Sequence, residues 1–186
     1  MKKISVLIPC FNEEEVFPVL RKELSTFLDK LSLKGYTYEV VLVDDGSRDF
    51  TWTLICDWTE LDPIHIKGIA LSRNFGHQAA LSCAYEAATG DVMVSIDADL
   101  QDPPELIKDL YHKMNEGYDV VFAQREQRVG ESWHKLITAK LFYRFINRLS
   151  DVSIPLDTGD FRIFSKKIND IIVSMPERNK FLRGQI

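Results

Sequence analysis

Short apolar runs alternate with segments of helical periodicity along the chain, and this alternation restricts the fold more than any other feature. We expect helices over Glu14–Leu31, Thr51–Leu61, Gly76–Thr89 and Pro103–Glu116, where apolar residues recur at helical spacing. Strand–helix alternation predicts an α/β domain in which helices flank a mostly parallel sheet. The expected strands are Ile4–Ile8, Tyr38–Val43, Ile64–Leu71, Val92–Ile96, Asp119–Ala123 and Phe161–Phe164.

Bulk properties are those of a globular domain. The chain has 186 residues, of which 45% are apolar and 27% charged, enough to enclose a substantial core. Its net charge of −5 gives no reason to expect a nucleic-acid partner. Three scattered cysteines, Cys10, Cys56 and Cys83, match neither a zinc-site spacing nor a disulfide framework and favour a reducing compartment.

The chain ends carry their own expectations. A strand begins almost at Met1, without a signal peptide, and no apolar run approaches the length of about 20 residues that spans a membrane. The final residues, Arg183–Ile186, contain no stop signal. The chain ends therefore predict a piece of a longer protein.

Polar motifs follow four of the expected strands. They are Asn12-Glu13, Asp44–Ser47, Arg73-Asn74 and the run that starts at Asp97. Ligands of open α/β sheets bind beyond the carboxyl ends of the strands, so these motifs predict a site at that edge.

The run Asp97–Glu105 is the most informative of them. Asp97 and Asp99 are two residues apart, so in an extended segment both side chains project to one side and repel unless a cation lies between them. Mg²⁺ uses one or two carboxylates plus substrate phosphates, so the pair predicts a metal that holds a diphosphate. Asp102, Pro103 and Glu105 are expected to start the following helix, with Asp102 as its cap.

The other motifs each allow a structural interpretation beside a functional one. Asp45 can bind a base or ribose, or belong to a turn that caps a helix. Phe11 can stack on a base or pack in the core, and Asn12 or Glu13 can cap the next helix. Arg73 can bind phosphate or form an ion pair, while His77 is a weak candidate on its own.

Residues 124–148 are basic in an acidic chain. Apolar residues recur at helical spacing over Trp133–Leu149, which fits either a helix lying on an anionic bilayer or one packed on its own domain. The loop 125–132 contains arginines that can meet an acceptor phosphate. Asp157–Arg162 groups two carboxylates and an arginine around a glycine, which suggests either a catalytic cluster or a turn with an ion pair.

Taken in order, IPCFNEE, VDDGS, SRNFGH, DADLQDPPE, DTGDFRIF and the terminal RGQI resemble family-2 glycosyltransferases of the GT-A (Rossmann-like) fold. The most similar branch transfers sugars to polyprenyl phosphate and includes dolichol-phosphate mannose synthases and bactoprenol glucosyltransferases. This resemblance implies inverting transfer of a hexose, preferably from UDP-glucose, at the cytoplasmic membrane face. It also implies Mg²⁺ or Mn²⁺ as cofactor and allows a homo-oligomer. Because members of the bactoprenol branch continue past RGQI into transmembrane helices, the resemblance further implies that this chain is the cytosolic catalytic domain of a membrane protein.

The resemblance assigns roles to individual residues. Asp97 and Asp99 would bind metal and diphosphate, Asp160 would be the catalytic carboxylate, and Asp99 and Arg125 would also take part in catalysis. Residues 1–124 would form the nucleotide-sugar core, and residues 125–186 the acceptor loop, the interface helix and the DTGDFR segment of the same domain. The acceptor phosphate would meet Arg125, with Arg128 or His134 assisting. The donor would contact Pro9, Phe11, Glu13, Asp45, Asp97 and Gln101.

Three alternatives remain beside the preferred function. GDP-mannose can replace UDP-glucose as the donor, since no motif fixes the sugar. A nucleotide-sugar-binding domain that acts only with a partner fits the same motifs. A sugar-nucleotidyltransferase is less consistent, because such an enzyme needs a Gly-rich basic loop where this chain has Cys10–Glu14.

Overall fold

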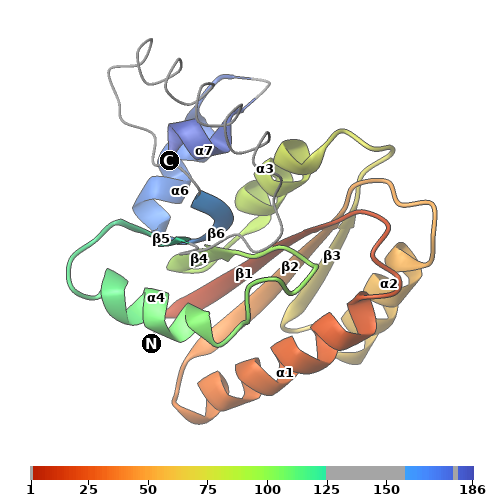
Figure 1. The fold of residues 1–186 in the computed structure, drawn as a ribbon, viewed down its shortest axis with the longest axis horizontal. Helices are drawn as coiled ribbons and strands as arrows, with labels where there is room; N and C mark the ends of the chain where they lie inside the picture. Colours follow the sequence, from red (N-terminus) through yellow and green to blue (C-terminus); the bar gives the residue numbers. More distant parts are fainter. Residues whose placement is uncertain (1, 125–157, 178–179) are drawn as a thin grey trace, which may run out of the picture.

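The computed structural model describes residues 2–124, 158–177 and 180–186, which form one six-stranded sheet with helices on both faces (Figure 1). The strand order across the sheet is β3-β2-β1-β4-β6-β5. The strands are β1 (Lys3–Cys10), β2 (Thr37–Asp44), β3 (Ile66–Ala70), β4 (Val92–Ser95), β5 (Val120–Gln124) and β6 (Thr158–Ser165).

Most of the sheet is parallel, as the alternation predicts. β1 lies between β2 and β4 and pairs with both in parallel, and β3 extends the parallel part beyond β2. β6 runs antiparallel between β4 and β5. The segment after residue 157 thus supplies an inner strand of the same sheet.

Two helical layers cover the sheet. The helices are α1 (Phe17–Leu33), α2 (Thr51–Leu61), α3 (His77–Ala87), α4 (Leu106–Met114), α6 (Lys166–Ser174) and α7 (Leu182–Gln185). α1, α2 and α4 pack on one face, where Val6 and Ile8 of β1 meet Phe17 of α1. α3, α6 and α7 pack on the other, where Leu7 of β1 belongs to the same core as Leu81 of α3.

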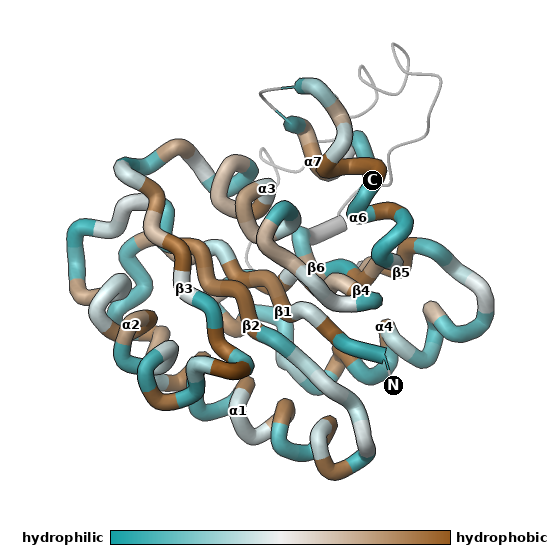
Figure 2. Tube along the Cα trace, turned by 180° about the vertical axis from the view of Figure 1, so that it is seen from behind, coloured by the Kyte–Doolittle hydropathy of each residue, from teal (hydrophilic) through white to brown (hydrophobic). Residues whose placement is uncertain are grey.

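Alternate side chains of β1 enter opposite cores because successive residues of a strand face opposite sides. Both sides are buried, so the central strands are apolar almost throughout, which Figure 2 shows as a concentration of hydrophobic residues in β1 and β2.

Two helices begin later than predicted. α1 starts at Phe17 rather than Glu14, after a turn in which the carbonyl of Glu13 accepts bonds from the amides of Val16 and Phe17. The prediction that Asp102 caps a helix starting at Pro103 is wrong, because α4 starts at Leu106 and Glu105 is its N-cap. A residue before proline is disfavoured in helical conformation, and both Asp102 and Pro103 precede one.

A buried polar cluster ties the amino ends of the strands together, away from the carboxyl ends where ligands bind. Glu39 on β2 accepts hydrogen bonds from Lys3 Nζ (2.8 Å), Ser5 Oγ (2.5 Å) and both the amide and the hydroxyl of Thr89 (2.6 and 2.8 Å). These bonds anchor the segment between α3 and β4 to the first two strands.

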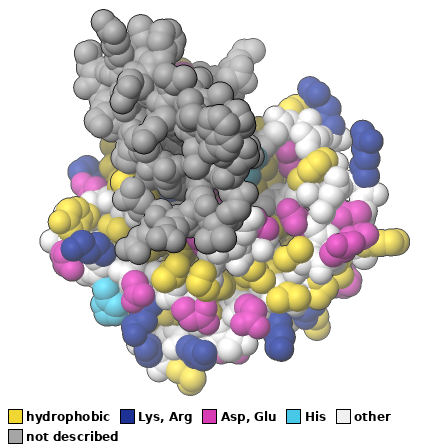
Figure 3. Space-filling view, in the orientation of Figure 1, with side chains coloured by type: hydrophobic (Ala, Val, Ile, Leu, Met, Phe, Trp, Pro, Cys, Tyr) yellow, Lys and Arg dark blue, Asp and Glu magenta, His cyan; other side chains and the backbone are white. Residues whose placement is uncertain are grey.

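Several predictions fall on residues 125–157, which lie outside the described part. They are the helix Trp133–Leu149 and the acceptor residues Arg125, Arg128 and His134. Among the described residues, none of the helices has the length and apolar character that crossing a bilayer requires. On the face drawn in Figure 3, acidic and basic side chains of the described part are interspersed.

Candidate functional site

A cavity of about 620 Å³ opens at the carboxyl ends of the parallel strands. It receives residues from the ends of β1 and β4, from the loop after β2, from β6 and from the first turn of α3. The lining residues are Pro9, Cys10, Phe11, Glu13, Asp45, Asn74, Gly76, His77, Gln78, Ala80, Asp97, Ala98, Asp99, Asp160 and Phe181.

Most of the site residues expected from the sequence therefore meet in one cavity. Those that line it are Pro9, Phe11, Glu13, Asp45, Asp97, Asp99 and Asp160. Gln101 is exposed and is not part of the lining. Arg125, Arg128 and His134 lie outside the described residues, so their expected roles stay predictions.

Asp45 holds the loop between β3 and α3. Its side chain is 2% exposed, and its two carboxylate oxygens accept hydrogen bonds from the amides of Phe75 (2.7 Å) and Gly76 (2.9 Å). The neighbouring Gly46 has φ +69°, and a Cβ added there would come within 2.4 Å of the Arg73 carbonyl carbon. The two loops thus touch backbone to backbone, which only glycine permits.

The loop after β1 is locked to the loop after β2. Asn12, with φ 55°, donates its amide to Ser47 Oγ (2.9 Å) and accepts the amide of Arg48 at its side chain (2.9 Å). The amide of Glu13 donates to Thr51 Oγ1 (2.7 Å). Asn12 therefore joins the two loops rather than capping α1.

The Asp97 run turns immediately after β4. Asp99 is exposed and accepts the amide of Gln101 at 3.0 Å, while Leu100 adopts φ 56°. Burial raises the pKa of Asp97, Asp160 and Asp99 raise it further, and His77 opposes them. Burial and the carboxylates of Asp99, Asp49 and Asp97 likewise raise the pKa of Glu13. This side of the cavity thus concentrates negative charge.

Asp160 is the most deeply buried acid of the cavity after Asp45, with 4% exposure. Its Oδ1 accepts Arg162 Nη2 at 2.6 Å, and its Oδ2 lies 3.0 Å from His77 Nε2. Ser95 Oγ donates to the Asp160 backbone carbonyl at 2.6 Å. A buried carboxylate requires such partners, because an unpaired charge in the interior costs several kcal/mol.

His77 is the main residue whose position the sequence does not predict. It opens α3, and its Nε2 also lies 3.9 Å from Asp97 Oδ1. Sequence spacing cannot bring Asp160 to it, because that contact depends on β6 inserting beside β4. The polar motif that ends the third strand was the available signal. Asn74 lines the cavity as the Arg73-Asn74 motif predicts, whereas Gly76, Gln78 and Phe181 line it without having been predicted.

The donor atoms fit a divalent cation. One ligand atom each from His77, Asp97 and Asp160 lie within 4.8 Å of one another. Carboxylate oxygens are the usual ligands of Mg²⁺ and Mn²⁺, and imidazole is a common ligand of transition metals. This group therefore offers the kinds of donor atoms that would hold a divalent cation.

The family model for "Glycosyl transferase family 2" matches residues 5–172. An uncharacterized glycosyltransferase of Synechocystis sp. is 44% identical over 98% of this chain and 56% of its own length. A prophage bactoprenol glucosyl transferase homolog of Escherichia coli is 40% identical over 98% of this chain and 58% of its own length. The chain spans only about half the length of the curated relatives it matches.

Solved structures share the fold at low identity. Glucosyl-3-phosphoglycerate synthase of Mycobacterium tuberculosis, in complex with Mn²⁺, UDP and glucosyl-3-phosphoglycerate, has a TM-score of 0.64 and 22% identity over 90% of this chain and 58% of its own. A mannosyltransferase of Pyrobaculum calidifontis, in complex with GDP-Man and Mn²⁺, has a TM-score of 0.58 and 19% identity. The match covers 94% of this chain and 48% of the mannosyltransferase chain.

Proposed function

The chain belongs to glycosyl transferase family 2 and has the GT-A fold, and from this membership we propose that it transfers a hexose from a nucleotide sugar to polyprenyl phosphate with inversion. UDP-glucose is the preferred donor, because relatives 40% identical to this chain are named bactoprenol glucosyl transferases. The observation that supports the proposal most strongly is the cavity itself. Five of the six residues expected to contact the donor line it together, namely Pro9, Phe11, Glu13, Asp45 and Asp97.

The nucleoside end of the donor would bind where the loops after β1 and β2 meet. Phe11 is 40% exposed at the cavity and offers a ring face for stacking on the base. Glu13 offers a carboxylate to ribose hydroxyls. Asp45 would contribute mainly by holding the loop between β3 and α3 in place, because both its carboxylate oxygens already accept backbone amides.

The diphosphate would lie over the turn after β4. Asp97 and Asp99 are the metal ligands expected from the sequence, and Gln101 follows the same turn. A bound divalent cation supplies positive charge to the leaving nucleoside diphosphate. The hydrogen bond from the Gln101 amide to Asp99 and the burial of Ala98 fix the turn after β4. A fixed turn would keep the bound diphosphate in one position.

Asp160 would position the reacting sugar or the incoming phosphate. Arg162 contacts one oxygen of its carboxylate and His77 the other, so the orientation of the carboxylate is fixed. An acceptor phosphate is already anionic near neutral pH, so transfer needs no strong general base. Arg125, assisted by Arg128 or His134, would bind the acceptor phosphate and bring it in line with the sugar against the repulsion of the diphosphate.

The reaction would take place at the cytoplasmic face of a membrane, where the lipid acceptor resides. Polyprenyl phosphate exposes only its phosphate to water, so the enzyme has to work at the bilayer surface. The basic, aromatic segment Trp133–Leu149 supports this placement by its composition alone.

Transfer of radiolabelled glucose from UDP-glucose to a short polyprenyl phosphate tests the proposal. GDP-mannose and UDP-galactose run in parallel decide the donor, and Asp97→Asn serves as the inactive control. Sugar transfer from GDP-mannose alone would establish the mannosyl alternative. Donor binding without transfer to any lipid would instead support a nucleotide-sugar-binding domain that needs a partner.

A further inference from the structure

The cavity places an imidazole against two of its acids. His77 Nε2 lies 3.0 Å from Asp160 Oδ2 and 3.9 Å from Asp97 Oδ1. The three residues come from α3, β6 and the turn after β4, so three separate elements converge on one point. The sequence prediction for the metal named only Asp97 and Asp99.

These separations match those between the ligands of one cation. In an octahedral site with bonds of about 2.1 Å, ligand atoms at right angles lie about 3 Å apart and opposite ones about 4 Å apart. The described group with ligand atoms within 4.8 Å contains His77, Asp97 and Asp160 but not Asp99. Asp99 instead accepts the Gln101 amide at the exposed side of the turn.

The surroundings fix two of the three donors in place. Arg162 binds Oδ1 of the buried Asp160, which leaves Oδ2 on the side of His77. Asp45 accepts the amides of Phe75 and Gly76, the two residues directly before His77. The imidazole is thus presented from a helix start whose preceding backbone is anchored by a buried carboxylate.

Resting on the proposed function, we propose that His77 and Asp160 join Asp97 as ligands of the divalent cation, and that the imidazole makes this site prefer Mn²⁺ to Mg²⁺. Magnesium favours oxygen ligands and loses its water reluctantly. Manganese shares magnesium's use of carboxylates, but it belongs to the transition-metal series that binds mixed nitrogen and oxygen sites, so an imidazole costs it less than it costs magnesium. One nitrogen among oxygens therefore discriminates between the two ions.

Binding of Mn²⁺ to the purified protein, in the presence and absence of UDP-glucose, tests this without any turnover. Free Mn²⁺ is counted by electron paramagnetic resonance, and Mg²⁺ affinity is obtained by competition. His77→Gln keeps a polar side chain of similar size but removes the imidazole. It should weaken Mn²⁺ binding by roughly tenfold or more while changing Mg²⁺ binding less than about threefold.

His65→Gln is the matched control. His65 is 39% exposed, as against 40% for His77, and also contacts an aspartate, with Nδ1 2.9 Å from Asp62 Oδ1. It stacks on Tyr38 and does not line the cavity. If His77→Gln weakened Mn²⁺ binding only because a surface histidine–aspartate pair was lost, His65→Gln would weaken it as well. If the lost group is a metal ligand, His65→Gln should bind Mn²⁺ like the wild type.

A spectroscopic signature separates ligation from a merely structural role. Bound Mn²⁺ should show electron spin-echo modulation from an imidazole ¹⁴N in the wild type and in His65→Gln, and none in His77→Gln. Mn²⁺ bound without nitrogen modulation would overturn the inference and leave the proposed transfer intact. Failure of both cations to bind, even with UDP-glucose present, would overturn the metal-dependent transfer as well.

Discussion

His77 and Asp160 meet at 3.0 Å through side chains that belong to different layers of the molecule, one at the start of α3 and one on the antiparallel strand β6. The contact lies in the cavity where the donor is proposed to bind. It connects the helix on one face of the sheet to the strand that separates β4 from β5. Any change that displaces β6 therefore changes the acid environment of the cavity.

Asp160→Asn should lower glycosyl transfer by roughly a hundredfold, because the positioning carboxylate loses its charge and its fixed direction. Turnover and the KM for the donor are measured with radiolabelled UDP-glucose. Arg162 loses its charged partner, so the melting temperature should fall as well. Asp170→Asn removes an exposed carboxylate paired with Lys166 and is the control. Undiminished turnover in Asp160→Asn would remove this residue from the mechanism.

Asp45→Ala should destabilise the fold by roughly 2 kcal/mol, since two backbone amides lose a charged acceptor. Urea denaturation followed by circular dichroism measures this effect. Nucleotide affinity should fall together with stability, because the loop before α3 lines the cavity. Asp29→Ala, on the exposed side of α1, should change neither quantity. Normal stability with weakened nucleotide binding would instead assign Asp45 to the nucleoside alone.

Glu39 should make the folded state sensitive to acid. Burial alone would raise its pKa, but hydrogen bonds from Lys3, Ser5 and Thr89 outweigh burial and lower the pKa from 4.5 to about 2. A depressed folded-state pKa means that the unfolded chain takes up the proton first. The stabilisation is therefore complete above about pH 4.5 and is lost progressively as the pH falls towards 2.

Glu39→Gln isolates this contribution. The variant should be less stable than the wild type at pH 7, and the difference between the two should shrink as the pH is lowered from 5 to 2. Denaturant titrations at several pH values measure it. Glu23→Gln, an exposed position on α1, provides the comparison. A constant difference across this range would show that the carboxylate charge is not the source.

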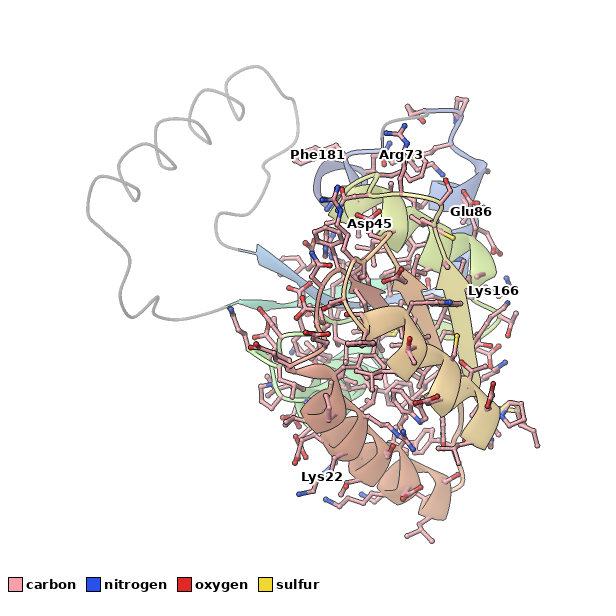
Figure 4. All side chains as sticks on the ribbon, turned by 90° about the vertical axis from the view of Figure 1, so that its right-hand side faces the viewer. Lys22, Asp45, Arg73, Glu86, Lys166 and Phe181 are labelled. Atoms are coloured by element: carbon pink, nitrogen blue, oxygen red, sulfur yellow. The ribbon has the colours of Figure 1, made fainter. Side chains whose placement is uncertain are left out.

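Arg125→Ala should raise the KM for polyprenyl phosphate by about tenfold or more while leaving UDP-glucose affinity unchanged, because the guanidinium is proposed to meet only the acceptor. Steady-state kinetics with each substrate varied in turn separate the two constants. Lys22→Ala removes a positive charge from α1, which Figure 4 shows at the end of the molecule remote from Asp45. An equal rise in both constants would contradict an acceptor-specific role.

Much of the fold follows from periodicity. The apolar runs locate β1 to β4 within a few residues, because strands buried on both faces, such as β1, β2 and β4, carry mostly apolar side chains. The position of β6 does not follow, since an apolar run does not encode which neighbour it pairs with. Helix starts were displaced where local bonding or proline opposed them, as at Glu13 and Pro104.

The site residues that could be predicted from the sequence are those at the ends of parallel strands. Pro9, Glu13, Asp45 and Asp97 each follow or close a parallel strand, so their convergence follows from topology. His77 and Phe181 enter from helix ends, and their positions depend on how α3 and the carboxyl-terminal segment pack. Only tertiary contacts define such positions. Asp160 was recognised through its motif. Its contact with His77 could not be predicted, because it depends on the packing of β6 beside β4.

The placement of β6 also orders the assembly of the molecule in time. Among the described strands β5 pairs only with β6, and the edge of β4 that faces away from β1 is covered by residues 158–165. An open apolar edge invites pairing with another chain. Asp160 is therefore synthesised on the same strand that covers this edge, so a growing chain acquires the proposed catalytic carboxylate only together with the strand that closes the open border of β4.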